Sequence, residues 1–283
     1  MITALVSKKG GVGKSTTAVS LAAALALAGR RTLLIDLDSQ ASASLSLGVP
    51  RHLLAPSTAD VLLRDMPAWR AVRATALPNL HLLTASADLH CVEEELTRMP
   101  DPAKRLEQAL VDLTPDYEIT LIDCPATMSL ITTNALVAAD SFLLPVVPQY
   151  LAIEGVQNLL EAVRRMRTRY GASARLAGIL LTMVDYRTRA GKENAARLRE
   201  LYGERVFAVE VRTNIRLAEA PEQGLTIFEY DARSSGARAY QLLSQEFLWR
   251  TAADGQPEAQ PGPGPRRGEA YRFLRTSASG LPR

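Results

Sequence analysis

The first 28 residues constrain the fold more than any other part of this chain. Residues 2–6 form a short apolar run that is typical of a buried parallel strand, and residues 15–28 form a long run of small and apolar side chains that ends at Gly29, a helix stop signal. Between them lies a loop rich in glycine and lysine, Val6-Ser7-Lys8-Lys9-Gly10-Gly11-Val12-Gly13-Lys14-Ser15-Thr16. A strand, a glycine loop and a helix, in that order, are what a phosphate-binding loop requires.

The loop differs from the ordinary pattern at one place. That pattern is G-x-x-x-x-G-K-[ST], in which backbone N–H groups surround the phosphates, the lysine contacts the β- and γ-phosphates and the hydroxyl contacts Mg²⁺. Gly13, Lys14 and Ser15 fit it, but Lys8 stands where the first glycine should be, and Lys9 follows. The helix after the loop adds its free N–H groups and the positive end of its dipole to the charge of Lys14. The loop therefore carries one lysine more than phosphate binding needs.

Apolar runs alternate with helical stretches along the chain, which is typical of βαβ units. Strands are expected at residues 2–6, 32–35, 80–83, 119–122, 141–146, 176–181 and 206–211. Helices are expected at residues 15–28, 59–64, 89–99, 102–113, 130–138, 153–170, 190–201 and 235–249. Several strands lack polar alternation, which fits burial on both faces. The sequence predicts an α/β fold with a doubly wound, mostly parallel sheet flanked by helices, and ligands at the carboxyl ends of its strands.

Composition divides the chain into one domain and a tail. A chain of 283 residues with 47% hydrophobic residues can bury a substantial core. Eight of the fourteen residues 255–268 are proline or glycine, so this stretch is expected not to pack. We therefore expect a folded domain over residues 1–251 and a disordered Pro/Gly-rich tail over residues 252–283. Tyr271, Phe273 and Leu274 lie among arginines near the end, where a solvated tail is favoured over docking on membrane, DNA or a partner.

Several classes of protein are excluded by what the sequence does not contain. No run of about 18 uncharged apolar residues suits a membrane span. A strand that begins at residue 2 leaves no room for a signal peptide, so a cytoplasmic location is expected. Cys91 and Cys124 are too few and too far apart for a disulfide framework or a zinc site, and both are expected to be buried as small hydrophobic side chains.

Positive charge is concentrated in one segment. The net charge of the whole chain, +3, does not by itself indicate nucleic-acid binding. Residues 187–216, however, carry eight lysines and arginines against four glutamates, a net charge of +4. This segment is the candidate for contact with a polyanion.

Two further strands end in aspartate. Asp36 and Asp38 follow the apolar run at residues 33–35, and Asp123 follows the one at residues 119–122. An apolar strand that ends in aspartate is the Walker B form, whose carboxylate holds Mg²⁺, usually through its water shell. Each alone is a weak signal, because such an aspartate is often only a cap or a turn former. Together with the glycine loop they predict a site for a magnesium nucleotide.

These motifs resemble those of the ParA/MinD group of deviant-Walker ATPases, and most closely the Soj-like ParA ATPases of chromosome and plasmid partition. The resemblance covers about residues 1–250. Its matching pieces are Lys9-Gly10-Gly11-Val12-Gly13-Lys14-Ser15-Thr16, Asp36-Leu37-Asp38-Ser39-Gln40, Leu121-Ile122-Asp123-Cys124-Pro125, Glu154-Gly155, Leu181-Thr182-Met183-Val184-Asp185, Asn214-Ile215-Arg216-Leu217-Ala218-Glu219-Ala220-Pro221, Tyr230-Asp231 and Gly236-Ala237.

The resemblance assigns roles to individual residues. Lys9 matches the signature lysine, which reaches across an ATP-sandwiched dimer to the phosphates held by the other subunit; such a cation offsets charge as an arginine finger does. Asp38 matches the residue that positions the attacking water, and Asp36 one that supports the metal shell. The residues assigned to ATP are Lys9, Gly10, Gly11, Val12, Gly13, Lys14 on the β/γ-phosphates, Ser15, Thr16 on the α-phosphate, and Asn214 near the adenine. The residues assigned to Mg²⁺ are Ser15, Asp36 and Asp123.

The resemblance also implies partners. Arg187 and Arg216 match positions that contact non-specific double-stranded DNA, and backbone phosphates attract such side chains without regard to base sequence. For Arg197, Arg199 and Arg205 a solvated charged face is favoured instead. The implied function is an ATP-dependent partition ATPase with slow intrinsic hydrolysis. Its ATP-bound homodimer coats nucleoid DNA, and a ParB-type centromere-binding protein triggers hydrolysis and release.

The sequence departs from the family pattern at two places, and two alternative functions are weighed against the partition ATPase. Ala126 follows Pro125 where the second switch usually has Pro-Pro, and Arg212-Thr213 precede Asn214 where Pro-Arg is common. A MinD-like membrane-cycling ATPase would need an amphipathic terminal helix with a broad apolar face, for which the tail offers little. An electron-transfer or cluster-assembly protein would need cysteines paired between two subunits, which Cys91 and Cys124 do not suit.

Overall fold

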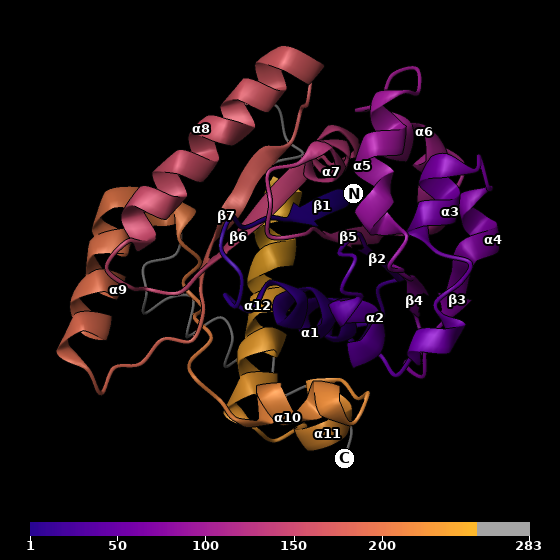
Figure 1. Ribbon diagram of the computed structural model, residues 1–283. Helices are drawn as coiled ribbons and strands as arrows, with labels where there is room; N and C mark the ends of the chain where they lie inside the picture. The colour runs from indigo at the N-terminus through magenta and orange to yellow at the C-terminus, as the bar shows by residue number, and fades with distance from the viewer. Residues whose placement is uncertain (254–283) are drawn as a thin grey trace.

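The computed structural model describes residues 1–253, and its centre is a sheet of seven strands (Figure 1). The strand order is β3-β4-β2-β5-β1-β6-β7. All neighbouring pairs are parallel except β3 and β4, so β3 is an antiparallel edge strand. The strands are β1 (Ile2–Leu5), β2 (Thr32–Asp36), β3 (Val72–Ala74), β4 (Leu80–Leu83), β5 (Ile119–Asp123), β6 (Ser141–Val146) and β7 (Arg175–Leu181). The predicted doubly wound α/β sheet is confirmed.

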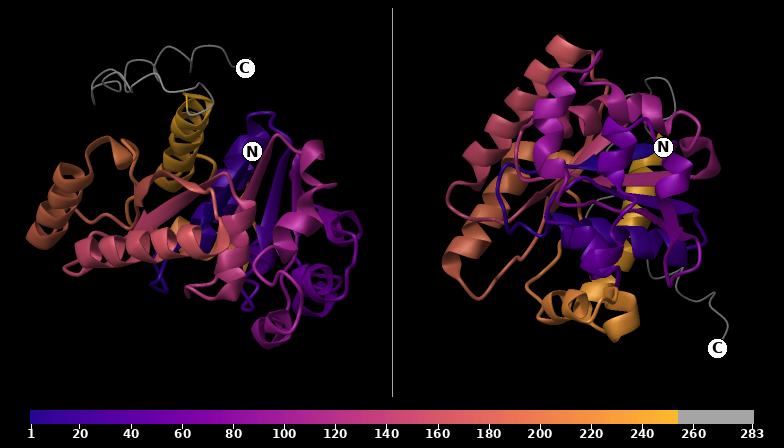
Figure 2. Two further views of the ribbon diagram at one scale, coloured as in Figure 1. Left: turned by 90° about the horizontal axis from the view of Figure 1, so that it is seen from above. Right: turned by 45° about the vertical axis from the view of Figure 1, so that its right-hand side comes forward.

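Helices cover both faces of the sheet. The α-helices are α1 (Lys14–Leu27), α2 (Ser42–Ser46), α3 (Thr58–Leu63), α4 (Ala68–Ala71), α5 (Leu89–Thr97), α6 (Arg105–Leu110), α7 (Leu130–Ala138), α8 (Ala152–Tyr170), α9 (Arg189–Tyr202), α10 (Arg216–Glu222), α11 (Ile227–Asp231) and α12 (Ser235–Ala253). Short 3-10 turns lie at η1 (Arg51–Leu53), η2 (Thr114–Asp116) and η3 (Gly203–Arg205). The left view of Figure 2 shows α8 on one side of the sheet and α12 on the other.

Successive residues of each central strand enter two different cores. In β2, Leu33 and Ile35 belong to the core that includes residues of α3, α5, α7, α8 and α9, whereas Leu34 belongs to the core that includes residues of α1 and α12. Because side chains of a strand alternate between faces, a strand buried on both sides needs an unbroken apolar run. The apolar stretches in the sequence follow from this double burial.

Helix α12 closes the second face by packing along α1, although some 220 residues separate the two in sequence. Phe247 and Tyr240 are fully buried there, and the Tyr240 hydroxyl lies 3.0 Å from the Thr17 hydroxyl. A buried hydroxyl needs such a partner. The helix that follows the glycine loop is thereby fixed in place from the far end of the chain.

One expected strand was wrong, and several short elements were not foreseen. Residues 206–211 form no assigned strand, and an isolated bridge joins Val206 to Ile179. The segment still bonds to β7 at both of its ends, where the N–H groups of Phe207 and Val211 donate to the carbonyls of Ile179 and Leu181, each at 2.9 Å. The N–H groups of Ala208 and Val209 donate instead to the carboxylate of Glu246 in α12, at 2.8 and 2.9 Å. The Glu246 carboxylate thus accepts the two hydrogen bonds that a neighbouring strand would otherwise accept. Elements β3, α2, α4, α10 and α11 were not expected, because they are short and carry no clear periodicity.

The described residues include the expected end of the domain but only the first two residues of the expected tail. Helix α12 continues to Ala253, two residues beyond the expected boundary, and the remainder of the tail expected at residues 252–283 lies outside the described residues. Within residues 1–253, no helix combines the length and the apolar character that crossing a bilayer would require.

Candidate nucleotide site and its surroundings

The glycine loop leads directly from β1 into α1 at the carboxyl edge of the sheet. Gly11 and Gly13 both have positive φ, +70° and +78°, a conformation that strains any residue with a Cβ. Gly13 is the residue that precedes the first turn of α1, and its carbonyl accepts from the N–H of Thr17 at 2.8 Å. The loop therefore turns sharply and presents the free N–H groups of a helix start, which is the geometry that binds phosphate.

Lys14 is buried at the base of this loop, with only 7% of its surface exposed. Its Nζ lies 2.8 Å from Oδ1 of Asp123 and 4.0 Å from Oδ2 of Asp38. Burial works to lower the pKa of Lys14, but attraction to these carboxylates outweighs it, and the pKa is raised. Lys14 therefore keeps its positive charge inside the protein, as the contact with phosphates requires.

Asp123 ends β5 and faces the same space. Burial raises the pKa of its carboxyl group, against the opposing effects of the Lys14 charge and of a hydrogen bond from the Ser15 hydroxyl. Its second oxygen, Oδ2, is buried and has no hydrogen-bond partner among the described residues. A buried oxygen without a partner is costly unless a cation or a water fills the space beside it. Ser15 and Asp123 therefore fit a Mg²⁺ shell.

Magnesium would depend on more than protein ligands here. No group of three or more histidine, cysteine, aspartate or glutamate side chains in residues 1–253 is arranged to hold a metal by itself. Mg²⁺ usually keeps several waters and takes one or two carboxylates together with substrate phosphates. One hydroxyl and one carboxylate beside a phosphate loop are what such a shared shell needs.

Asp36 lies next to Asp123, because β2 and β5 are in register at these two residues. It is fully buried and accepts hydrogen bonds from the N–H and the hydroxyl of Ser44, at 2.9 and 2.7 Å, and from the N–H of Asp38 at 3.1 Å. Burial and then the neighbouring Asp123 raise the pKa of Asp36 to about 7, against the lowering effect of the Ser44 bonds. Asp36 thus holds the loop after β2 onto α2, a partnership with Ser44 that the sequence analysis did not identify.

Asp38 and Lys9 reach the site from its exposed side. Asp38 is 19% exposed and its Oδ1 accepts from the N–H of Gln40 at 3.0 Å, which leaves Oδ2 toward Lys14. Lys9 is exposed, and its Nζ donates to Oε1 of Gln149 in the loop between β6 and α8, at 2.7 Å. Gln149 was missed in the sequence, where nothing marks it as a partner of a residue 140 positions away.

The remaining predicted nucleotide residue lies apart from this group. Asn214 donates through Nδ2 to the Ser235 hydroxyl at 2.7 Å and accepts through Oδ1 from the N–H of Arg216 at 2.8 Å. Both polar ends of its side chain are therefore used to join the start of α10 to the start of α12. An adenine contact through this side chain stays a prediction.

The two arginines predicted to contact DNA are both paired with acids. Arg187 makes a two-pronged contact with Asp185 at 2.9 and 2.8 Å, which holds the pKa of Asp185 down at about 2. Arg216 donates to Glu219 at 2.8 Å and lies 3.7 Å from Asp231. Their charge is partly balanced within the chain, and their DNA contact stays a prediction.

The two cysteines differ in their surroundings. Cys124 is buried, as expected, and burial raises the pKa of its thiol. Cys91 on α5 is exposed, so the expectation that it is a buried hydrophobic side chain was wrong. It lies on the outer side of a helix whose inward residues are Leu89, Val92 and Leu96, a spacing that could have indicated its exposure.

Comparisons with known proteins agree with this geometry. The family model described as "AAA domain" matches residues 1–176. The chain is 37% identical to the sporulation initiation inhibitor protein Soj of Bacillus subtilis over 245 residues, 87% of this chain and 97% of that protein. It is 40% identical to the chromosome-partitioning ATPase Soj of Thermus thermophilus over 252 residues, 87% of this chain and 95% of that protein.

A solved structure gives the same result for the fold. The cobyrinic acid a,c-diamide synthase of Mycobacterium smegmatis, with bound ADP and magnesium, superimposes with a TM-score of 0.77 at 30% identity. The match covers 92% of this chain and 99% of that one. The loop, the paired carboxylates and the relatives agree, and this chain belongs to the ParA/Soj family of chromosome-partitioning ATPases.

Proposed function

We propose that this protein is a DNA-partitioning ATPase that ATP converts from monomer to DNA-binding dimer. The observation that carries the proposal is the buried ion pair of Lys14 and Asp123 beside the glycine loop, 2.8 Å long, in which one oxygen of Asp123 has no hydrogen-bond partner among residues 1–253. A charged pair with an unused buried oxygen is costly for stability alone. It is well suited to a site that phosphates and a cation complete.

ATP binding is assigned to the loop at residues 9–16. Its N–H groups and Lys14 hold the phosphates, while Ser15 and Asp123 hold Mg²⁺, which would neutralise charge on the β- and γ-phosphates. Asp38, only partly buried and 4.0 Å from Lys14, positions the attacking water. With no strong base beside that water, hydrolysis is slow until a partner completes the alignment.

Lys9 is the dimer contact in this proposal. It is exposed on the same edge as the loop and must leave Gln149 to reach phosphates on another protomer. Exposed apolar side chains follow the neighbouring strands β6 and β7 on that edge and suit a protein interface. These side chains are Tyr150 and Leu151 after β6 and Met183 after β7.

The partners follow from the same cycle. Non-specific double-stranded DNA is bound by the dimer, a ParB-type protein stimulates hydrolysis, and the protein is a cytoplasmic one associated with the nucleoid. Placing two basic surfaces side by side on one dimer couples ATP to DNA affinity through doubled contacts. The Thermus thermophilus relative, which is named a chromosome-partitioning ATPase, supports this assignment.

The test is to size the protein with and without ATP, and with DNA across a salt series. We expect wild type to become a dimer with ATP and to bind DNA with salt-dependent affinity. Lys14→Ala should weaken ATP binding on the order of 10- to 100-fold through loss of a charged hydrogen bond. Lys9→Ala should bind ATP but stay monomeric, and Asp38→Ala should remain a DNA-bound dimer because hydrolysis is blocked.

Lys8→Ala is the matched control for Lys9, because Lys8 is also exposed and stands next to it in the loop. It should dimerise as wild type does. A Lys9→Ala protein that dimerises with ATP as readily as Lys8→Ala would disprove the sandwich. If the affinity for DNA changes neither with ATP nor with salt concentration, the proposed ATP-dependent switch in DNA binding is disproved.

A further inference from the structure

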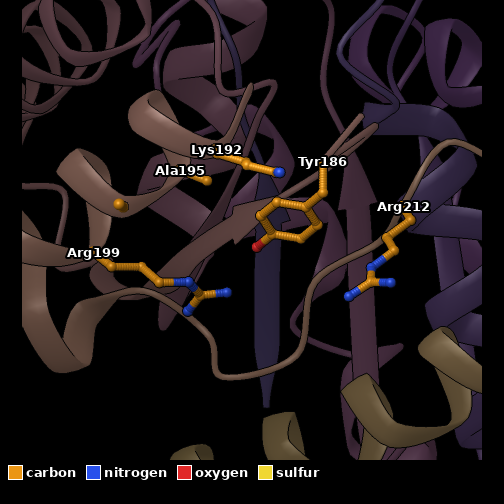
Figure 3. A pocket seen from close by; sticks show the side chains of 6 residues that line it. Tyr186, Lys192, Ala195, Arg199 and Arg212 are labelled. Carbon is orange, nitrogen blue, oxygen red and sulfur yellow. The ribbon is translucent and has the colours of Figure 1, made fainter. Parts of the chain in front are cut away.

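A cavity of about 330 Å³ lies between α9 and the segment at residues 206–212, away from the glycine loop (Figure 3). Its size is at the lower end of the range for ligand pockets, about 300–1,000 Å³. The residues that line it are Tyr186, Lys192, Ala195, Ala196, Arg199 and Arg212. Nothing in the nucleotide site described above uses these side chains.

The spacing along α9 explains why the cavity is open and basic. Lys192, Ala195, Ala196 and Arg199 follow the i, i+3, i+4, i+7 pattern and so share one face of the helix. The two alanines in the middle leave space, and the two cations stand at either end. Figure 3 shows Arg212 on the opposite side, with the Tyr186 ring between it and the helix.

The positive charge of the pocket exceeds its negative charge. Glu210 is the nearby acid, and its carboxylate is shared: it accepts from the Tyr186 hydroxyl at 2.7 Å and from Arg199 at 3.0 Å, and lies 3.5 Å from Nε of Arg212. Two of the three cations that line the pocket, Arg199 and Arg212, thus share one carboxylate. Lys192 makes no ion pair or hydrogen bond within residues 1–253, and neither do the two Nη groups of Arg212.

Other acids near the pocket are taken by arginines outside it. Asp185, next to Tyr186, is paired with Arg187, and Glu193, next to Lys192, is paired with Arg189 at 2.6 Å. The arginines that the sequence singled out are therefore partly neutralised. In the pocket, by contrast, Arg199 and Arg212 share the single carboxylate of Glu210, and Lys192 has no acidic partner within residues 1–253.

The free donors suit one kind of anion. Lys192 offers an ammonium with three N–H groups, and Arg212 offers a planar fork that binds two oxygens at once. Arg212 is held in place because its guanidinium stacks on the Tyr186 ring, 5.1 Å from the ring centre. An ammonium and an arginine fork around an open space match the oxygens of a phosphate.

We propose that this pocket is a second phosphate site, in which Lys192 and Arg212 bind a phosphoryl anion and the Tyr186 ring holds the guanidinium of Arg212 in place. The anion comes either from the DNA backbone or from a free phosphate. The DNA source rests on the proposed function; the free-phosphate source does not.

The experiment compares two double variants that remove the same charge. Lys192→Gln with Arg212→Gln removes the pocket donors, and both side chains are exposed, Arg212 by 68%, so the fold should be retained. Arg197→Gln with Arg205→Gln is the control, because both are exposed arginines near the pocket that do not line it. The full chain is used throughout, and a thermal melt of each variant checks folding.

The first measurement is calorimetric titration of inorganic phosphate into protein saturated with ADP and Mg²⁺, so that the glycine loop is already filled. The second is fluorescence anisotropy of a labelled DNA duplex with ATP across a salt series. We expect the pocket variant to lose phosphate affinity at least tenfold, while the control stays within twofold of wild type. In the DNA arm, the slope of log affinity against log salt should fall by about 1 for each lost contact relative to the control.

The results of the two measurements distinguish the DNA backbone from a free phosphate as the source of the anion. A specific loss in the DNA arm assigns the backbone, and a loss in the phosphate arm alone assigns a free phosphoryl group. If the wild-type protein binds no DNA at all, the proposed function fails, and the phosphate arm still decides the pocket. Equal behaviour of the two double variants in both arms overturns the phosphate site.

Discussion

At the scale of single residues, burial decides what each charged or reactive group can do. Lys14 and Asp123 are both buried, and each is tolerated because the other stands 2.8 Å away. Lys9, five residues before Lys14 in the same loop, is exposed, and its side chain donates a hydrogen bond to Gln149. Two lysines of one motif therefore have different freedom, which fits a fixed role for one and a movable role for the other.

The cysteines provide a direct test of burial. Only the thiolate reacts with alkylating reagents, and Cys124 is buried with a raised pKa, whereas Cys91 is exposed. We expect one equivalent of maleimide to label the native protein at neutral pH and two to label it in denaturant, as counted by intact mass. Cys91→Ser should reduce native labelling to none. Rapid native labelling of that variant would show that the loop after β5 opens.

At the scale of elements, glycines differ in whether the surrounding structure has room for a Cβ atom. In β7, a Cβ on Gly178 would stand 2.5 Å from Cε2 of Phe207, which is fully buried. In α8, a Cβ on Gly155 would meet nothing within 4 Å. The same substitution should therefore have opposite effects in the two elements.

We predict that Gly178→Ala lowers the free energy of unfolding by about 1–3 kcal/mol, because the buried ring must shift. Gly155→Ala should raise it by about 0.5–1 kcal/mol, because alanine loses less backbone entropy in a helix. Denaturant unfolding of both variants without nucleotide measures this. A neutral Gly178→Ala would mean that Phe207 is less tightly held than its burial indicates.

The segment at residues 206–212 shows how a side chain from a helix can prevent an apolar segment from forming a strand. Its apolar residues suited an eighth strand, but Glu246 of α12 takes the N–H groups of Ala208 and Val209. The chain bonds to β7 through Phe207 and Val211, on either side of these two residues, but forms no continuous ladder with it. The same segment leads into Arg212, which lines the pocket beside α9.

At the scale of the whole molecule, the last described helix, α12, packs on α1 and covers the core on one face of the sheet. Without α12, one face of α1 and the side chains around it, including Leu21 and Leu25, would be exposed to water. Burial of apolar area is the main favourable contribution to folding, at about 25 cal/mol per Å². We expect α12 to be required for the domain to fold.

Two truncations test the extent of the domain. A chain that ends at Ala253 should keep the thermal midpoint and the ATP affinity of the full chain, since all the elements described here remain. A chain that ends at Ser234 should fail to give a cooperative transition. Circular dichroism melts and ATP titration measure both. A large drop in midpoint for the longer truncation would show that the domain needs residues beyond α12.

The sequence by itself determined the glycine loop, the acidic strand ends and the apolar strands, because each is a local pattern whose geometry follows from neighbouring residues. The bounds of β4, β6 and α7 agree with those expected from periodicity alone. Asp36 and Asp123 were expected at one edge of the sheet, since parallel strands end there, but that they lie side by side depends on the strand order, which the structure shows.

Only the tertiary structure decided which groups are paired. The contacts of Asp36 with Ser44, of Lys9 with Gln149 and of Glu246 with the 206–212 segment join residues that no local pattern links. The same holds for the basic segment, where a count of charges could not tell paired Arg187 from unpaired Lys192. A sequence shows which charges are present, but hydrogen bonding and burial depend on neighbours that folding brings together.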